Sequence, residues 1–454
     1  MREEYDSLGK VLVPETKLWG AQTQRSINNF QIGDPSSMPI EIIKAYAILK
    51  KAAAYANYEL SVISKEKKEL IEMACNMIEA GELDEHFPLV IWQTGSGTQT
   101  NMNLNEVISN VVKKKSGISI HPNDDVNKSQ SSNDTFPTAM HIAAYKIIIS
   151  HILPSLEKLK LSLIRKSKQF SEIVKIGRTH LMDATPLTLG QEFSCYASQI
   201  DFGIKAIKNS LNHMLILPIG GTAVGTGINA PKNFDQYAVE HINQFTSCSF
   251  IVSENKFEGI AAHDAFVESH SALKQVAISL NKIANDIRLL ASGPRCGIGE
   301  LKLKANEPGS SIMPGKVNPT QCEAVSMVCA QVFGNDSVIG FAASKGQFQL
   351  NVFKPVIAFN FLFSARILAD ACLSFTENCI NTIEPDLNKI NKNLNNSLML
   401  ITCLNEKLGY DNCAKIAKNA HEKNISLMES SSELGFLTNE EYKNLVDVKK
   451  MTNS

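Results

Sequence analysis

The sequence predicts an all-α protein whose centre is a bundle of long helices. Apolar residues recur every three or four positions through the middle of the 454-residue chain, and strand-like alternation is sparse and short. The clearest repeat is a heptad seam formed by Phe266, Leu273, Val276, Leu280, Ile283, Ile287 and Leu290. A helix of ~25 residues is ~37 Å long, too long for one small domain to bury, so we expect other subunits to help cover it.

Two further segments repeat by threes and fours in the same way. Their apolar positions are Phe193, Tyr196, Ile200, Ile204, Ile207 and Leu211 in one segment, and Leu156, Leu159 and Leu163 in the other. Three long amphipathic helices in the middle of one chain are typical of a helical bundle.

Loops and helix breaks suggest a division into three domains. Residues 120–124 form a loop, Asn133 and Asp134 are suited to cap the helix that follows, and Lys354-Pro355 interrupts a long helical stretch. We therefore predict an N-terminal mostly helical domain over 1–131, a central long-helix domain over 132–355 and a small C-terminal helical domain over 356–454.

Composition excludes several classes of protein. The net charge is −1, from 45 basic and 46 acidic residues, so no basic excess favours a nucleic-acid partner. Uninterrupted apolar runs are far shorter than the ~20 residues of a membrane span. The acidic N-terminus has no apolar signal region, so we expect a cytoplasmic protein. The ten cysteines show no C-x-x-C spacing, which argues against zinc or iron–sulfur sites.

Two glycine-rich segments resemble dinucleotide-binding fingerprints. Residues 225–230 fit G-x-G-x-x-A, and Gly95-Ser96-Gly97 begins a similar pattern. A true fingerprint follows a strand and has an acidic residue about 20 positions later, and neither segment has that context. We expect both to be loops between helices.

Four segments are rich in Gly, Ser, Thr, Asn and His while their neighbours are periodic and apolar: residues 94–103, 128–134, 177–180 and 309–319. Any one of them could be an ordinary cap or turn. Four on one helical scaffold favour a polar site at the ends of the bundle's helices.

The last of these segments has the features of an anion site. Pro319 suits the first position of a helix, Asn318 could cap it, and Gln321 stands where a capping box would place it. A helix start favours a carboxylate or phosphate because its N–H groups are free, and Lys316 adds a full positive charge. An ordinary turn with a solvated lysine is the alternative.

The same segment, residues 309–319, resembles the signature of the aspartase/fumarase superfamily. The resemblance runs from residue 17 to residue 425 and is most similar to class II fumarases. The segments that carry it are 17–23, 92–103, 121–137, 177–191, 220–227, 255–258, 291–299 and 307–336.

Aspartate ammonia-lyase is the nearest alternative within the superfamily. It usually has Ala where this chain has Gly315, and a first loop reading G-A-G-T-S-T where residues 95–100 read G-S-G-T-Q-T. Residues 131–134 and 320–323 also match the fumarase pattern. Two departures from the family pattern are Cys195, commonly Gly, and Ile118, where some members have Arg near a second anion site. A crystallin-like scaffold role would not need the catalytic set present here.

The resemblance implies reversible hydration of fumarate to L-malate in the tricarboxylic acid cycle, without metal or organic cofactor. Ser310 matches the base that takes the C3 proton, giving an aci-carboxylate that Lys316 and Asn318 would stabilise. A serine base needs an oxyanion held by loop N–H groups. His180 with Glu323 matches the second acid/base unit, and the two are far apart in sequence.

The resemblance also implies how ligands bind and how subunits assemble. A homotetramer would share each active site between subunits. Separately, residues 295–308 are rich in Gly, Lys and Glu, and we expect them to form a mobile lid ahead of Ser310. A second dicarboxylate site would lie at His121, Pro122, Asn123 and Asp124. The substrate would contact Ser96, Gly97, Thr98, Ser131, Ser132, Asn133, Thr179, Ser311, Lys316, Val317 and Asn318.

Overall fold

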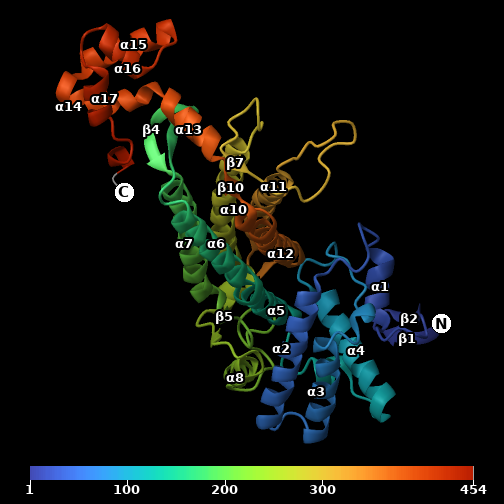
Figure 1. The fold of residues 1–454 in the computed structure, drawn as a ribbon. Coiled ribbons are helices and arrows are strands. Elements are labelled where there is room, and N and C mark those ends of the chain that lie inside the picture. Colours follow the sequence, from blue (N-terminus) through green and yellow to red (C-terminus); the bar gives the residue numbers. More distant parts are fainter. Residues whose placement is uncertain (453–454) are drawn as a thin grey trace. The chain divides into compact units, whose positions relative to one another are not determined.

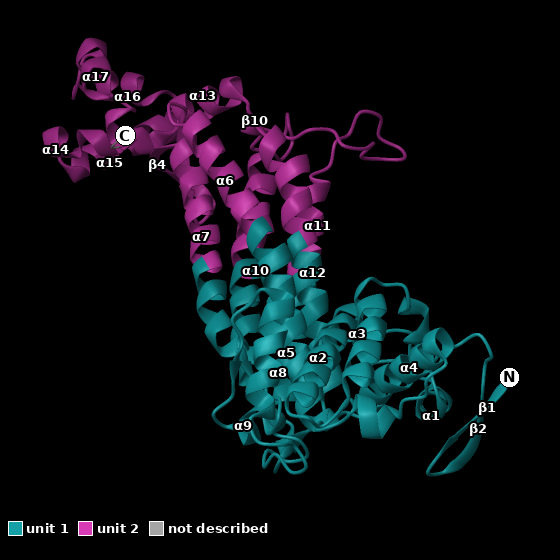
Figure 2. Ribbon diagram, turned by 90° about the horizontal axis from the view of Figure 1, so that it is seen from below, with its two compact units in different colours: residues 1–154, 205–277, 330–369 teal, residues 155–204, 278–329, 370–454 magenta. Residues whose placement is uncertain are grey.

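The computed structural model describes residues 1–452 and divides into two compact units (Figure 2). Unit 1 comprises Met1–Pro154, Lys205–Ala277 and Ala330–Ala369. Unit 2 comprises Ser155–Ile204, Ile278–Cys329 and the described residues from Asp370 onward. All five boundaries fall inside long helices. The division of the sequence at residues 131 and 355 stays a prediction.

The predicted long helices are confirmed. They are α6 (Leu153–Gln169), α7 (Leu189–Met214) and α10 (Asp264–Leu290), and two more follow, α11 (Thr320–Ala343) and α12 (Lys354–Asn378) (Figure 1). The apolar positions that predicted α6, α7 and α10 are all at most 8% exposed. Their spacing places them on one side of each helix, and that side is the buried one.

Unit 1 contains α2, an alanine-rich helix that is buried along most of its length and has several other helices packed around it. It packs against α3, α5 and α8, and α3 lies beside α4 (Figure 1). The bounds are α1 (Ala21–Asn29), α2 (Ile40–Glu59), α3 (Lys65–Glu79), α4 (Thr98–Ser116), α5 (Ser132–Ile147), α8 (Phe234–Thr246) and α9 (Lys256–Ala261).

The C-terminal helices of unit 2 have a hydrophobic core of their own. Leu404, Ile416, Ala420 and Leu427 are central to it, and Ile176 from strand β3 joins it. These helices are α13 (Leu387–Asn396), α14 (Asn405–Leu408), α15 (Tyr410–Lys423), α16 (Leu427–Glu433) and α17 (Asn439–Leu445).

Strands are short, and within residues 1–452 every sheet is two-stranded. Only β5 and β6 pair in parallel, over two residues each, so no sheet of the kind that carries a dinucleotide site is present there. Both glycine-rich segments are loops, as predicted. The strands are β1 (Arg2–Asp6), β2 (Gly9–Val13), β3 (Val174–Thr179), β4 (Met182–Thr188), β5 (Ile216–Leu217), β6 (Ile251–Val252), β7 (Leu301–Lys302), β8 (Gly346–Gln347), β9 (Leu350–Asn351) and β10 (Glu384–Pro385).

Two helices are long and apolar enough to cross a membrane by length and composition alone, Thr320–Ala343 and Lys354–Thr382. Counting uninterrupted apolar runs missed them because polar and charged residues, such as Asp336 in the first helix and Arg366 in the second, break both runs. Core helices of bundles pass the same test. Half of the apolar window in the second segment is buried, but only 28% of that in the first, so α11 exposes an apolar surface.

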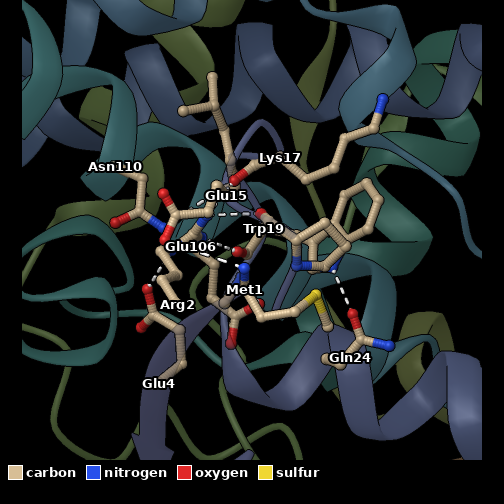
Figure 3. A network of polar contacts seen from close by, with 12 residues as sticks. Met1, Arg2, Glu4, Glu15, Lys17, Trp19, Gln24, Glu106 and Asn110 are labelled. Carbon is tan, nitrogen blue, oxygen red and sulfur yellow. Dashed lines mark hydrogen bonds and ion pairs between the residues drawn. The ribbon is translucent and has the colours of Figure 1, made fainter. Parts of the chain in front are cut away.

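The N-terminal segment is tied to α4 by a polar network (Figure 3). Glu106 on α4 accepts main-chain N–H groups of Gly20, Gln22 and Thr23 at 2.8–3.2 Å, so this remote carboxylate caps the start of α1. The Arg2 guanidinium donates to main-chain carbonyls of the same segment, among them that of Trp19. The network braces α4, whose first turn carries predicted substrate contacts.

Candidate active site

Three hydroxyl groups from two predicted loops meet in unit 1. Thr98 Oγ1 is hydrogen-bonded to Ser96 Oγ at 2.8 Å and to Ser132 Oγ at 2.7 Å. Thr98 opens α4 and Ser132 opens α5, so the first turns of both helices lie at this cluster. Free N–H groups at helix starts and short hydroxyls are suited to bind a carboxylate.

Two glycines let the chain reach this geometry. Gly97 precedes α4 with φ of 80°, and a Cβ there would lie 2.0 Å from the ring of Phe136. A Cβ on Gly95 would lie 1.3 Å from the carbonyl oxygen of Val352. Both positions therefore need glycine for packing, which explains the G-S-G sequence better than a nucleotide fingerprint does.

The start of α5 is held by a capping box. Ser131 is the cap, and the Asp134 carboxylate accepts the Ser131 N–H at 2.9 Å. The prediction that Asn133 and Asp134 cap this helix is thus corrected for Asn133, whose amide donates to the Ala223 carbonyl at 2.8 Å. The signal was present in the sequence as S-x-x-D.

Asp134 does more than cap its own helix. Its other oxygen accepts the N–H groups of Gly220 and Thr222, each at 2.9 Å. The side chain is completely buried, and burial raises the pKa of Asp134 to about 6 against the opposing effect of its N–H donors. Through these bonds the residue 220–222 loop is fixed to the turn that carries Ser132.

Two buried lysines near this turn were not predicted. Lys50 on α2 donates to Asn127 and Gln130 at 2.9 Å, and Lys354 donates to the main-chain oxygen of Asn133 at 3.4 Å. The sequence offered only a weak signal, a lysine inside an apolar, alanine-rich helix in the case of Lys50. Burial lowers the pKa of both lysines to about 7, with Asp134 acting in the opposite direction.

In unit 2, the residue 309–319 loop forms a small cradle around Ser310. The Ser310 Oγ accepts N–H groups of Ile312 at 3.2 Å and Met313 at 2.9 Å. The Gly309 N–H donates to the Lys316 carbonyl at 3.0 Å, which closes the loop. An oxyanion on Ser310 would thus have two N–H donors in place, as a serine base requires.

The predicted cap at the end of this loop is wrong. The Pro319 carbonyl accepts the Glu323 N–H at 3.1 Å, so α11 begins at Thr320. Asn318 lies outside the helix, and its amide donates to the Gly309 carbonyl. Gln321 forms no capping box because its oxygen accepts the Ser374 hydroxyl at 2.9 Å. Closing the loop uses the side chain that would otherwise cap the helix.

His180 stands at the exposed tip of the β3–β4 hairpin. His180 and Leu181 form a two-residue turn with φ of 56° and 62°. Left-handed backbone costs a non-glycine residue about 1–3 kcal/mol, and such strain clusters at functional sites. The neighbouring Thr179 hydroxyl position is exposed as well.

Buried charges anchor this hairpin. Glu300 is fully buried and receives two hydrogen bonds from Arg178, at 2.7 and 3.1 Å, and an ion pair from Lys175 at 3.3 Å. Burial opposes ionisation, but the Arg178 hydrogen bonds and the Lys175 charge outweigh it and lower the pKa of Glu300. Arg178 is two residues from His180, so this network fixes the base of the strained turn.

The structure does not join His180 to Glu323 within one chain. Glu323 lies exposed on the first turn of α11, and across residues 1–452 no hydrogen bond or ion pair links the two side chains. Lys316, Ser311 and Val317 are exposed on the same loop as Ser310, while Asn318 is half-buried.

The predicted second dicarboxylate site is a single turn of π-helix over Pro122–Val126. His121 caps it, with Nδ1 accepting the N–H groups of Asn123 at 3.2 Å and Asp124 at 3.0 Å. The four predicted residues are consecutive in the chain, and their role in binding a dicarboxylate stays a prediction. The two N–H groups that an anion would use are engaged by the imidazole of the same turn.

Within residues 1–452, no group of three or more His, Cys, Asp or Glu side chains is arranged to hold a metal ion. The ten cysteines are free thiols.

Comparison with known proteins identifies the family. A lyase family model matches residues 9–334, and a fumarase C C-terminus model matches residues 400–453. The chain is 61% identical to a class II fumarate hydratase of Pasteurella multocida, covering 100% of this chain and 99% of that protein, and 57% identical to one of Bacillus cereus, covering 99% and 98%. A crystal structure of class II fumarase from Schistosoma mansoni matches with a TM-score of 0.95 at 42% identity, over 99% of this chain and 98% of that one. The chain belongs to the family of class II fumarate hydratases.

Proposed function

We propose that this protein hydrates fumarate reversibly to L-malate. The names of its full-length relatives support this reaction. The observation that carries the chemistry is the Ser310 cradle, where two N–H groups point at the serine oxygen. Such a cradle stabilises the alkoxide that proton abstraction from C3 of malate requires.

The proton leaves a carbon next to a carboxylate, so charge builds on a group that is already anionic. In the proposed mechanism Lys316 neutralises this aci-carboxylate, and Asn318 helps by holding the loop closed at Gly309. Both residues belong to the same closed loop as Ser310. The base and the stabilising cation would thus be delivered together.

The other carboxylate of the substrate would bind in unit 1. Ser96, Thr98 and Ser132 offer hydroxyl donors at the starts of α4 and α5. Because these helix starts carry partial positive charge, they favour a dianion. Asn133 and Ser131 would contribute to the same turn.

We assign the water-handling step to His180 with Glu323. The exposed His180 tip can reach a partner, and a carboxylate beside it would favour the imidazolium form. Since no bond joins them in one chain, the proposal requires that different subunits contribute the two residues. The second dicarboxylate site at residues 121–124 and the lid over residues 295–308 stay predictions.

We also propose a homotetramer with shared active sites. The exposed side of α11 carries an apolar and small-residue stripe at spacings of four and three, formed by Met327, Ala330, Gly334, Ser337 and Phe341. Met327 is 68% exposed and Phe341 60% exposed. A helix that is apolar on both its buried and its exposed sides is suited to pack between chains. Glu323 lies one turn before Met327 on the same stripe.

A substrate assay tests the reaction directly. Fumarate formation followed by ultraviolet absorbance should proceed with L-malate and not with L-aspartate. Fumarate release from L-aspartate alone would instead assign aspartate ammonia-lyase activity. Rates should be unchanged by metal chelators, since the proposed chemistry uses no metal or organic cofactor, and a rate that falls with chelator would contradict that part.

A further inference from the structure

Two ammonium groups are buried beneath the turn that presents Ser132. Lys50 and Lys354 are both 0% exposed. Their hydrogen-bond acceptors are neutral oxygens, those of Asn127 and Gln130 for Lys50 and of Asn133 for Lys354. Burying an ammonium without a direct carboxylate partner costs several kcal/mol. Two such buried ammonium groups in one region of the protein therefore call for a functional explanation.

Asp134 is the nearby counter-charge. It interacts electrostatically with both lysines, but its oxygens are engaged by the N–H groups of Ser131, Gly220 and Thr222. With both lysines protonated and Asp134 ionised, the group retains one positive charge. That charge lies next to the turn that carries Ser132, whose hydroxyl belongs to the cluster with Ser96 and Thr98.

Lys50 reaches the loops of the hydroxyl cluster only through the side chain of Gln130, whereas Lys354 contacts both loops next to the hydroxyl residues. The Lys354 main-chain N–H donates to the Gly95 carbonyl at 3.1 Å, and its ammonium donates to the Asn133 carbonyl at 3.4 Å. Gly95 precedes Ser96, and Asn133 follows Ser132. One residue at the start of α12 thus sets the position of both chain segments.

We propose that Lys354 is a positioning residue for the carboxylate site. Its ammonium fixes the Asn133 main chain and supplies positive charge beneath the turn that offers Ser132 to the substrate. The inference rests on the proposed function, because it assigns the dicarboxylate of that reaction to this turn.

The other titratable groups facing Lys354 are Asp134 on α5 and His263 just before α10. His141 in turn interacts electrostatically with His263. Burial lowers the pKa of His263 and sets that of His141 at about 4, so both imidazoles are neutral near pH 7. Burial lowers the pKa of Lys354 to about 7. Its charge is therefore present below pH 7 and lost above it, and the KM for fumarate should rise across that range.

The first test replaces Lys354 with methionine, which fills the same space without charge. We expect K354M to raise KM for fumarate and malate about tenfold and to change kcat less than about threefold. The turn that Lys354 positions would bind the substrate and the transition state alike, so its loss weakens both equally. Binding of succinate, a dicarboxylate that cannot react, should weaken by the same factor. The rise of KM above pH 7 should disappear.

Lys166 provides a matched control. It is also buried, at 9% exposure, and donates to a main-chain carbonyl, that of Ile383 at 2.8 Å in unit 2. K166M removes the same chemistry from a site without a proposed ligand, so KM and succinate binding should stay at their original values. Equal KM values in K354M and K166M would overturn the proposal.

A double-mutant cycle with S132A tests whether Lys354 acts through the turn. If it does, the KM of the K354M/S132A double variant should be close to the higher of the two single-variant KM values. A KM increase in the double variant that equals the product of the two single-variant increases would overturn the proposal. Should K354M fail to assemble in light scattering, K354Q serves instead, since it keeps a polar side chain at this buried position but carries no charge. A KM equal to that of the parent in K354Q would overturn the proposal.

Failure of the proposed function looks different. If the unaltered protein does not convert malate to fumarate, the reaction is wrong, and succinate binding still compares K354M with K166M. If turnover is normal and K354M binds succinate as tightly as K166M does, the reaction stands and the role of Lys354 is wrong.

Discussion

The two halves of the proposed active site are built in opposite ways. In unit 1 the hydroxyl cluster sits on helix starts that are fixed by buried charge, chiefly Asp134 and Lys354. In unit 2 the Ser310 loop is exposed and held by bonds within itself. In the proposed mechanism the first half would be preorganised to bind, and another chain would complete the second half. The contrast predicts different kinetic effects for changes in each half.

The largest effect should follow from separating the chains. M327E places a carboxylate on the exposed apolar stripe of α11, and burying an unpaired charge in an interface costs several kcal/mol. We expect dissociation and a loss of activity greater than about 10³-fold. Light scattering and malate turnover measure both, with Y410E at a 77% exposed position as control. A fully active monomer would contradict the shared site.

Next in size is loss of the Ser310 hydroxyl. S310A should lower kcat by about 10²–10⁴-fold, the range for losing an acid or base, while succinate binding stays nearly unchanged. Steady-state kinetics and calorimetry on the assembled protein check this. Near-normal kcat in S310A would transfer the role of base to His180.

Loss of the Lys316 charge should impair both catalysis and substrate binding. K316A removes a cation that contacts the substrate and stabilises the aci-carboxylate, so we expect kcat to fall about 10²-fold and KM to rise about tenfold. K316R should recover part of the kcat because it restores the charge. An unchanged KM would place Lys316 away from the substrate carboxylate.

A change in unit 1 should affect binding alone. T98V keeps the shape of the side chain and removes the hydroxyl that bonds both Ser96 and Ser132. A hydrogen bond to a charged group is worth about 1.5–3 kcal/mol, so KM should rise about tenfold or more with kcat within about threefold. A fall in kcat comparable to that of S310A would erase the contrast between the halves.

The smallest effect on turnover is expected from the hairpin anchor. E300Q removes the carboxylate that Arg178 and Lys175 share and leaves Lys175 paired only with Glu192, which should cost about 3 kcal/mol of stability and lower kcat only a few-fold through the His180 tip. The lowered pKa of Glu300 means that its contribution is present above the unfolded pKa and lost as pH falls through the folded one. Thermal melts should show a weaker acid dependence in E300Q than in the parent protein.

The sequence predicted much of the fold because helix periodicity is local. The seam on α10 and the repeats on α6 and α7 required no knowledge of partners, and each proved to mark the buried side. The glycine-rich segments were correctly read as loops for the same reason, since the absence of a strand before them is visible in the chain.

The candidate site could be predicted as a set of loops but not as a geometry. The sequence identified Ser96, Thr98 and Ser132 as polar, and only packing brings positions 98 and 132 within hydrogen-bond distance. The cap assigned to Asn318 was wrong because loop closure competes for the same amide. Sequence rules for helix caps consider one hydrogen-bond partner of a side chain at a time. Which of the competing partners the side chain bonds is decided by the tertiary structure.

The helical bundle, the four polar segments and the types of residue that carry the chemistry could all be predicted, because each depends on spacing along one chain. Only the tertiary structure decided that Lys50, Asp134 and Lys354 share one buried region, and that Glu300 anchors the strained turn at His180. The reason is physical. A charge is stable in an interior only with specific neighbours, and those neighbours come from segments that are far apart along the chain.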